Sequence, residues 1–514
     1  MWPFTSKRPA TARVEPVVSV PAVSVQVLPG RGKRYGGASV APRFGDFDGS
    51  PRSADAELVF TLAKLRQRSR ALRRDNPHVA RYFQLREDNV IGSTGIVFSS
   101  QARNTNDSLD VTGNDRVESA WRDWCRRPTV DGKMSFNDAL RLIDAAHACD
   151  GDVFIELVTN GAYRDSIAFQ VLEADWVDET MNRPAVGNQN QIRMGVEIDS
   201  FGKPVAYWFL TYHRGDMDYA VGRELHRRIP ADRIIHFYKR RRPGQSRGEP
   251  LLVSVLLALK MVDGYRDSEI TNRRVRAALG GFFEEESGDV GVSGMADNPG
   301  VADDELEMYL EPGQVRKLPR GVTFKPFDPS SGGEDYAQFE KAMLRAIASG
   351  VGVSYVSLAN DLEGVSYSSI RQGTLDDRER WMTEQEYLVN HVVRPIFERW
   401  LAMWMLNNPS SLPSSKFDKF VSGAQFVGRR WPWVDPAKDV QATISELDAG
   451  LTSHSAVARQ NGMDYSDIVK EIQADQKLLQ SAGVKLGIVS NAGQSTAKES
   501  AADGGDPGSG AEDG

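Results

Sequence analysis

The chain has 514 residues, of which 40% are hydrophobic and 26% charged, enough for two to four folded domains with a large core. Its 70 Asp and Glu outnumber its 63 Lys and Arg, and the net charge of −7 argues against a protein that grips nucleic-acid phosphates over a broad surface. No apolar run approaches the roughly 20 residues that cross a bilayer, and no apolar core of a signal peptide follows residues 1–4. The two cysteines, Cys125 and Cys149, form no close pair, which argues against a disulfide scaffold or a zinc cage.

The first part of the chain predicts an irregular arm followed by helices. Residues 1–53 are rich in Pro, Gly, Val, Ser and Arg without a sustained period, so we expect an arm that is flexible or draped over a neighbour. For its cluster Arg31, Lys33 and Arg34, a solvated arm is favoured over contact with nucleic acid. Residues 54–74 predict one cationic helix that Asn76-Pro77 ends. A short helix over about 78–88 and a strand at 95–98 follow.

The next region predicts two amphipathic helices and then a mainly β segment. The apolar faces of the helices are marked by Val117, Trp121 and Trp124 in the first and by Phe136, Leu140, Ile143 and His147 in the second. The strands are expected at 152–158, 168–172, 196–199, 205–210 and 233–238. The Gly-containing turn at 200–203 indicates a hairpin between the third and fourth of these strands.

A cationic loop, residues 240–250, precedes a long predicted helix over 251–280. Pro250 suits the first helical turn, and Gly280-Gly281 suits a C-terminal cap. The helix is apolar in its first half and charged in its second half, where Glu269 and Arg273 stand four residues apart in the favourable order. On periodicity alone, a core helix behind a basic loop explains this region equally well.

An acidic window follows, because no Lys or Arg lies between Arg276 and Arg316. A solvated acidic loop is one explanation of this window, above all for residues 287–303. Residues 322–327 predict a β strand, and a second helix is expected over about 335–349.

A loop at 354–364 separates this helix from a very long helical pattern over about 367–407. Pro395 lies inside that pattern and removes a hydrogen bond to the carbonyl of His391, so we predict a kink there. Ser368 and Ser369, which follow Tyr367, suit a helix cap. Two further helices are expected at 440–449 and about 465–480, and the Gly-, Ser-, Ala- and Asp-rich residues 485–514 predict an acidic disordered tail.

The sequence contains no recognisable catalytic motif. It lacks a phosphate-binding Gly-x-x-x-x-Gly-Lys-Ser/Thr loop, a His-Glu-x-x-His helix and a Gly-x-Ser-x-Gly elbow. His147, Cys149, Asp150 and Asp152 lie close in sequence, but a helix end that turns into a strand should point them in different directions. His236 and His391 lie in apolar stretches and are expected in the core. We therefore predict no catalytic residue, no metal site and no cofactor.

Five separated motifs resemble the portal proteins of lambda-like tailed phages, in the family's order, over roughly residues 54–408. They are the Ile-Ile-His strand end at 234–236 with Arg-Pro-Gly-Gln-x-Arg-Gly-x-Pro at 242–250, Asn-Val-Ile-Gly-Ser-Thr-Gly-Ile at 89–96, Gly-Asp-Val-Phe at 151–154, Glu-Ala-Asp at 173–175 and Tyr-Ser-Ser-Ile-Arg at 367–371.

The resemblance implies an α+β multidomain portal fold. Its parts would be an N-terminal arm at 1–53, a wing at 54–249, a first stem helix at 250–281, a clip at 282–332, a second stem helix at 333–350, a tunnel loop at 351–366, a long kinked helix returning to the wing or crown at 367–440, crown helices at 441–484 and an acidic tail at 485–514.

The function that the resemblance implies is a homo-oligomeric ring of about twelve subunits at one capsid vertex of the virion, assembled in the host cytoplasm. Double-stranded DNA would be packaged and ejected through it. Its partners would be the terminase, the major capsid or scaffold protein, and head–tail connector proteins, with no membrane contact. Another phage structural component (a connector or baseplate protein) and a nucleic-acid enzyme remain as alternatives.

The resemblance also assigns expected site residues. The DNA-facing tunnel-loop positions are Asn360, Asp361, Glu363 and Ser366; the acidic clip positions for docking partners are Glu284, Glu285, Glu286, Glu305 and Glu307; the candidates for inter-subunit contacts are Arg240, Arg241, Arg242 and Arg247. These four arginines and the cationic stretch Arg66 to Arg74 are expected to make inter-subunit or wing contacts.

Overall fold

A computed structural model of the chain describes residues 51–216, 226–277, 281–285, 322–326, 333–364, 366–431, 436–460 and 465–481. Residues 1–52 form a unit separate from residues 53–514. Residues 1–50 of the predicted arm, the centre of the acidic window and the predicted acidic tail lie outside the described residues. Every helix and strand that the structure describes belongs to the second unit.

The first helices differ from the single helix predicted over 54–74. The chain forms α1 (Ala54–Leu58) and, after a break at residues 59–61, α2 (Leu62–Asp75). Ser53 caps α1, and the Asn76 side chain accepts from two free N–H groups of α3 (Pro77–Arg86), so Asn76-Pro77 both ends α2 and begins α3. A π-helical turn (Glu87–Ile91) continues α3.

The mixture of helices and antiparallel sheets is confirmed, and it occupies residues 97–238. The helices are α4 (Val111–Trp124) and α5 (Phe136–Asp150); the strands are β1 (Val97–Ser100), β2 (Asp152–Thr159), β3 (Ile167–Glu173), β4 (Gln191–Arg193), β5 (Val196–Ile198), β6 (Pro204–Leu210), β7 (His226–Pro230) and β8 (Ile234–Tyr238). Short 3₁₀ turns lie at Arg164–Ser166, Ala174–Trp176 and Ala231–Arg233.

Strands β2 to β8 form two sheets, whereas β1 pairs with β11 from a later part of the chain, Ala424–Val427. One has the order β3-β2-β8 and the other β4-β5-β6-β7, with antiparallel neighbours throughout. The hairpin predicted at 200–203 joins β5 and β6, and Gly202 there has φ +80°, which glycine adopts without strain. The short strands β4 and β7 were not predicted from the sequence.

The long helix predicted over 251–280 begins later than expected. Residues 251–255 form turns, and α6 runs from Leu256 to Ala277, so Pro250 is not in its first turn. Glu269 and Arg273 form the predicted pair, with Nε and Oε1 2.9 Å apart.

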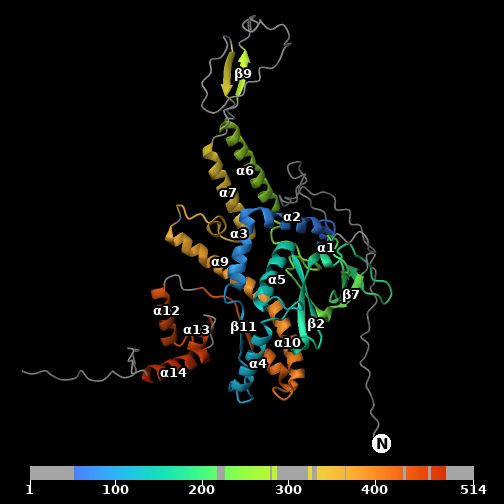
Figure 1. The fold of residues 1–514 in the computed structure, drawn as a ribbon, viewed down its shortest axis with the longest axis vertical. Helices are drawn as coiled ribbons and strands as arrows, with labels where there is room; N and C mark the ends of the chain where they lie inside the picture. Colours follow the sequence, from blue (N-terminus) through green and yellow to red (C-terminus); the bar gives the residue numbers. More distant parts are fainter. Residues whose placement is uncertain are drawn as a thin grey trace, which may run out of the picture. The chain divides into compact units, whose positions relative to one another are not determined.

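Helix α6 lies beside α7 (Gly333–Val351), as Figure 1 shows. Between them in the sequence, β9 (Gly281–Glu285) pairs antiparallel with β10 (Val322–Pro326), which confirms the predicted return strand. A pair of antiparallel strands therefore lies between the two helices in the sequence.

After α7 the chain forms the short helix α8 (Tyr355–Ala359), and then α9 (Tyr367–Leu388). A π-helical turn (Val389–Val393) separates α9 from α10 (Arg394–Asn407), and Pro395 lies in the first turn of α10. The helix is thus irregular just before Pro395, where the sequence predicts a kink. The chain continues through a 3₁₀ turn (Ser414–Lys416), α11 (Phe417–Ser422) and β11 (Ala424–Val427).

The C-terminal elements are α12 (Pro436–Asp448), α13 (His454–Gln460) and α14 (Tyr465–Ser481). The first and last correspond to the predicted helices, whereas α13 was not predicted. In the part of the chain that the structure describes, no helix is long and apolar enough to span a membrane.

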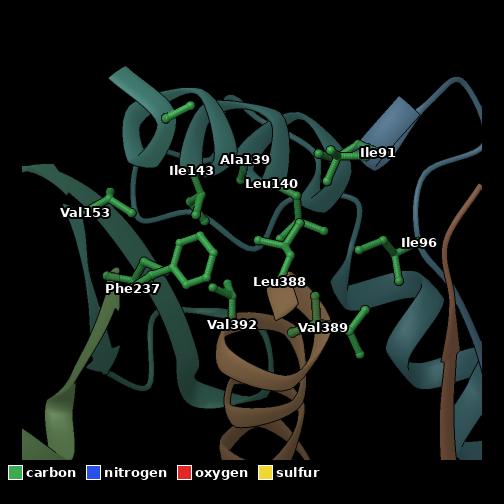
Figure 2. Packing of buried hydrophobic residues seen from close by; sticks show 14 of the residues in the cluster. Ile91, Ile96, Ala139, Leu140, Ile143, Val153, Phe237, Leu388, Val389 and Val392 are labelled. Carbon is green, nitrogen blue, oxygen red and sulfur yellow. The ribbon is translucent and has the colours of Figure 1, made fainter. Parts of the chain in front are cut away.

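The core forms where α5 packs on the end of α9. Figure 2 shows Ala139, Leu140 and Ile143 of α5 facing Leu388, Val389 and Val392, with Val153 and Phe237 of the three-stranded sheet beside them. An aromatic group centred on Trp121 extends this core, and it comprises Phe98, Trp121, Trp124, Phe136, Phe397, Trp400 and Phe426. The end of the long helix is thereby fixed against the α/β region.

Candidate functional site

Three of the five motifs that carry the family resemblance meet around Arg247, which is fully buried. Its guanidinium forms an ion pair with Asp152 at the start of β2, and it donates to the carbonyl oxygens of Ala174 and Met194 at 2.9 and 3.1 Å. His236 Nε2 lies 3.2 Å from the same Asp152 carboxylate. Segments 151–154, 173–175, 234–236 and 242–250 thus come together at one buried charge pair.

Glycines complete this junction. A Cβ on Gly248 would lie 2.1 Å from the Gly151 carbonyl oxygen, and a Cβ on Gly151, which has φ +94°, would lie 2.3 Å from the Glu249 backbone. The backbones approach so closely that only glycine fits at both positions. These motif residues therefore have a structural role.

Arg247 makes its contacts within the α/β region, which is one of the two roles predicted for it, because its charge is neutralised inside the chain by Asp152. Burial by itself would raise the pKa of Asp152, but Arg247 and the hydrogen bond with His236 hold that pKa below its usual value. Sequence reasoning missed this pair because a cationic loop normally indicates a solvated surface.

The three arginines before it are partly exposed. Arg240 donates to the Tyr238 hydroxyl at 2.9 Å, Arg241 pairs with Glu249 at 3.0 Å, and Arg242 pairs with Glu57 of α1 at 2.7 Å. Their inter-subunit role stays a prediction.

The cations of α2 make contacts within the α/β region, which is one of the two roles predicted for them. Arg66 is fully buried and pairs with Asp175 and Glu179 at 2.6 and 2.8 Å. Arg70 forms a two-pronged hydrogen bond with Asp150 at 2.7 and 2.8 Å. Helix α2 is thus tied to the strand ends by charge pairs.

The predicted DNA-facing residues lie in the segment between α7 and α9. Asn360 ends α8 in the left-handed conformation (φ +53°) and is exposed, and Glu363 and Ser366 are also exposed. Ser366 accepts a hydrogen bond from the Ser369 N–H, so it is the N-cap of α9. The cap of α9 is therefore Ser366, and not Ser368 or Ser369 as predicted.

Asp361 differs from the other three residues because its carboxylate is already engaged. It accepts from the Glu363 N–H at 3.0 Å and from the Tyr355 hydroxyl at 2.8 Å, and Lys341 Nζ lies 3.1 Å away. These contacts, the backbone hydrogen bond foremost, lower the pKa of Asp361 to about 2.

A second buried charge cluster joins the far part of α9 to the α/β region. Arg86 of α3 binds both oxygens of Asp144 at 2.6 and 3.0 Å and also reaches Glu384 of α9 at 3.1 Å. Lys239, just after β8, reaches the other oxygen of Glu384 at 2.5 Å. The cluster therefore links four separate segments through two cations and two carboxylates.

The histidines fall in different environments. His236 is nearly buried against Asp152, as expected, whereas His391 is exposed and stacks on Tyr387, which contradicts its expected place in the core. His147 of α5 is fully buried against the Phe237 ring, and burial lowers the pKa of His147 to about 4.

The acidic and thiol side chains at the junction of α5 and β2 are engaged separately. Asp150 pairs with Arg70 and Asp152 with Arg247, whereas the Cys149 thiol contacts Ser69. Among the described residues, Glu173, Asp175 and His213 could bring three donor atoms within 4.8 Å of one another. Asp175 is already paired with Arg66 and Arg70, so these residues do not form a free ligand set.

Most of the acidic residues predicted to dock partner proteins lie outside the described part of the chain. Glu284 and Glu285 lie in β9, opposite Thr323 and Val322, whereas Glu286, Glu305 and Glu307 lie outside the described residues. Their docking role stays a prediction.

The family model described as "Phage portal protein, lambda family" matches residues 41–385. The chain belongs to the lambda family of phage portal proteins. The match covers the α/β region, the paired helices, the loop and most of α9.

Relatives in this family share the sequence over most of its length. The chain is 33% identical to the probable portal protein of Halomonas phage phiHAP-1 over 440 residues, which cover 85% of both chains. It is 22% identical to portal protein B of Escherichia phage lambda and to the portal protein of Escherichia phage N15, covering 88% of this chain and 91% of each relative.

Among solved structures, the chain is similar to the neck of a native gene transfer agent particle computed with C12 symmetry. The TM-score is 0.40 and the identity 16%, over 77% of this chain and 93% of that one. A chain of the virion of the native gene transfer agent particle gives a TM-score of 0.42 at the same identity.

Proposed function

We propose that copies of this chain close into a ring of about twelve subunits at one capsid vertex, and that double-stranded DNA enters and leaves the capsid through it. Membership of the lambda portal family, with the match over residues 41–385, is the observation that carries this proposal. On this proposal residues 54–249 form the wing, α6 and α7 the stem, β9–β10 the base of the clip, and residues 351–366 the tunnel loop.

The charge of the chain supports a conduit. Duplex DNA carries one negative charge per about 1.7 Å, so a cationic lining would hold it in one register. Each copy has a net charge of −7, and an exposed carboxylate, Glu363, lies on the loop. A ring of such copies would repel the phosphates and let the duplex slide.

The partners are part of the same proposal. The acidic window that includes Glu284, Glu285, Glu286, Glu305 and Glu307 would receive basic surfaces of the terminase during packaging and of connector proteins afterwards. Arg240, Arg241 and Arg242 would reach the neighbouring subunit, and the wing would meet the major capsid or scaffold protein.

Electron microscopy of the purified protein in negative stain tests the ring. We expect closed rings with a central hole wide enough for a duplex. Sheets, rods or monomers under the same conditions would instead favour a different structural component, such as a connector or baseplate protein.

Charge reversal on the loop tests the DNA path. Glu363→Lys should leave ring assembly intact and reduce the number of DNA-filled particles, because the new cation would hold phosphates; Glu363→Gln should have a smaller effect. Unchanged packaging by both variants would remove Glu363 from the mechanism.

A further inference from the structure

The segment between α7 and α9 has two parts that differ in exposure. In the loop base, residues 353–361, Val353 and Leu358 are buried. In the loop tip, residues 362–364, the Leu362 side chain is 64% exposed, and Glu363 and Gly364 are exposed as well. The base therefore belongs to the packed structure and the tip does not.

Two sets of contacts, called ties below, hold the loop base to the flanking helices, and the first joins it to α9. Asp377 accepts from the Ser354 N–H at 2.9 Å, from the Ser354 hydroxyl at 2.7 Å and from the Ser357 hydroxyl at 2.8 Å. Ser354 is also the N-cap of α8. One carboxylate of α9 thus fixes the beginning of α8.

The second tie runs to α7. Lys341 forms an ion pair with Asp361, and the Tyr355 hydroxyl donates to the same carboxylate. The Tyr355 ring also lies near two cations one turn apart on α7, with Lys341 Nζ 5.8 Å and Arg345 Cζ 5.5 Å from its centroid. The base is therefore tied to both helices that flank it.

We propose that Lys341, Asp361 and Asp377 are positioning residues that hold the loop base rigid, so that the tip alone reaches the DNA. The inference rests on the proposed function for its DNA contact, and it changes the role expected for Asp361. The Asp361 charge is neutralised by Lys341, so the carboxylate that remains free to act on phosphates is that of Glu363.

A charge swap separates this role from simple repulsion of DNA. The single variants K341D and D361K each place like charges together, whereas the double variant K341D/D361K restores an ion pair of reversed direction. If Asp361 acts by positioning, the double variant recovers what the singles lose. If Asp361 acts by repelling phosphates, a cation at that position stays harmful with either partner.

Two measurements are made on each variant. Hydrogen exchange of the purified full chain reports on residues 353–361. We expect exchange there to be at least about tenfold faster than in the wild type for the two single variants and for D377A, and to return to the wild-type rate in the double variant. The number of DNA-filled particles from phage carrying each variant should follow the same order. E363K is the matched control, because it makes the same change of charge as D361K further along the loop. It alters neither the side chains of the two ties nor the Glu363 N–H that donates to Asp361, so it should leave exchange of the base unchanged.

The outcomes that overturn the proposal are distinct. Unchanged exchange in the singles would show that the ties do not hold the base. Exchange that recovers in the double variant without recovery of packaging would show that the Asp361 charge itself acts on DNA. Wild-type protein that neither forms rings nor packages DNA would refute the proposed function, while the exchange of the base would still report on the ties.

Discussion

At the scale of single residues, the buried charges of this chain are paired across long sequence distances. Arg247 and Asp152 are separated by 95 residues and are both fully buried. A buried pair contributes little net stability relative to an apolar pair, but removal of one partner leaves an uncompensated charge inside the protein. These positions are therefore intolerant of single changes.

Arg247→Leu should lower the free energy of unfolding by about 3–5 kcal/mol, because Asp152 would lose its cation in a buried site. Urea denaturation followed by circular dichroism measures the change. Arg242→Leu is the matched control, since it removes a half-exposed pair with Glu57 and should cost no more than about 1 kcal/mol. Equal losses in the two variants would contradict the structural role of Arg247.

Glu384 should make stability depend on acid pH. Burial alone would raise its pKa, but Arg86 and Lys239 lower it to about 2. Because the pKa in the folded state lies below that of the unfolded chain, the stabilisation is complete above about pH 4.5 and is lost as the pH falls toward 2.

We expect the unfolding free energy of the wild type to fall more steeply between pH 4.5 and 3 than that of Glu384→Gln. Glu386→Gln, on the exposed side of the same helix, should follow the wild type. Denaturation curves at fixed ionic strength give the comparison, and parallel curves for all three proteins would rule out the effect.

At the scale of elements, one aromatic group joins α4, α5, α10 and the β1–β11 pair. The Trp121 ring lies within 5.3 Å, centroid to centroid, of Trp124, Phe136, Phe397 and Trp400. Helix α10 and β11 come from the end of the long helical region and from the chain beyond it. The group therefore binds that region to the α/β part through ring packing, to which Trp400 adds a hydrogen bond from Nε1 to Asp165 at 2.9 Å.

Trp121→Ala should cost about 3–5 kcal/mol, because the cavity it leaves is surrounded by rings that cannot close over it. Phe201→Ala, at the tip of the β5–β6 hairpin with 95% exposure, should change stability by no more than about 0.5 kcal/mol. Thermal and urea unfolding of both variants test this. A tolerated Trp121→Ala would show that the group is not a continuous core.

At the scale of the whole molecule, the acidic balance predicts weak affinity for DNA away from the assembled particle. With a net charge of −7, the purified protein should bind duplex DNA no more tightly than a Kd of about 10⁻⁴ M at physiological salt, the weak end of nonspecific binding. Fluorescence anisotropy with a random duplex measures it. Submicromolar binding would favour a clamp over a conduit.

Elements whose pattern is local could be predicted from the sequence. The apolar faces of α4, α5 and α7, the β5–β6 hairpin and the β10 return strand follow from side-chain periodicity and turn residues within a few positions of each other. Five short motifs, compared with a known family, also indicated where these elements belong.

The contacts between segments that are distant in sequence follow from the three-dimensional fold and could not be predicted. Strand β11 pairs with β1 across more than 300 residues, and Arg247 is buried because Asp152, Ala174 and Met194 converge on it. Asp361 is engaged because Lys341 of α7 faces it. Whether a charged side chain meets solvent or a counter-ion depends on which distant segment packs beside it, and no local pattern contains that information.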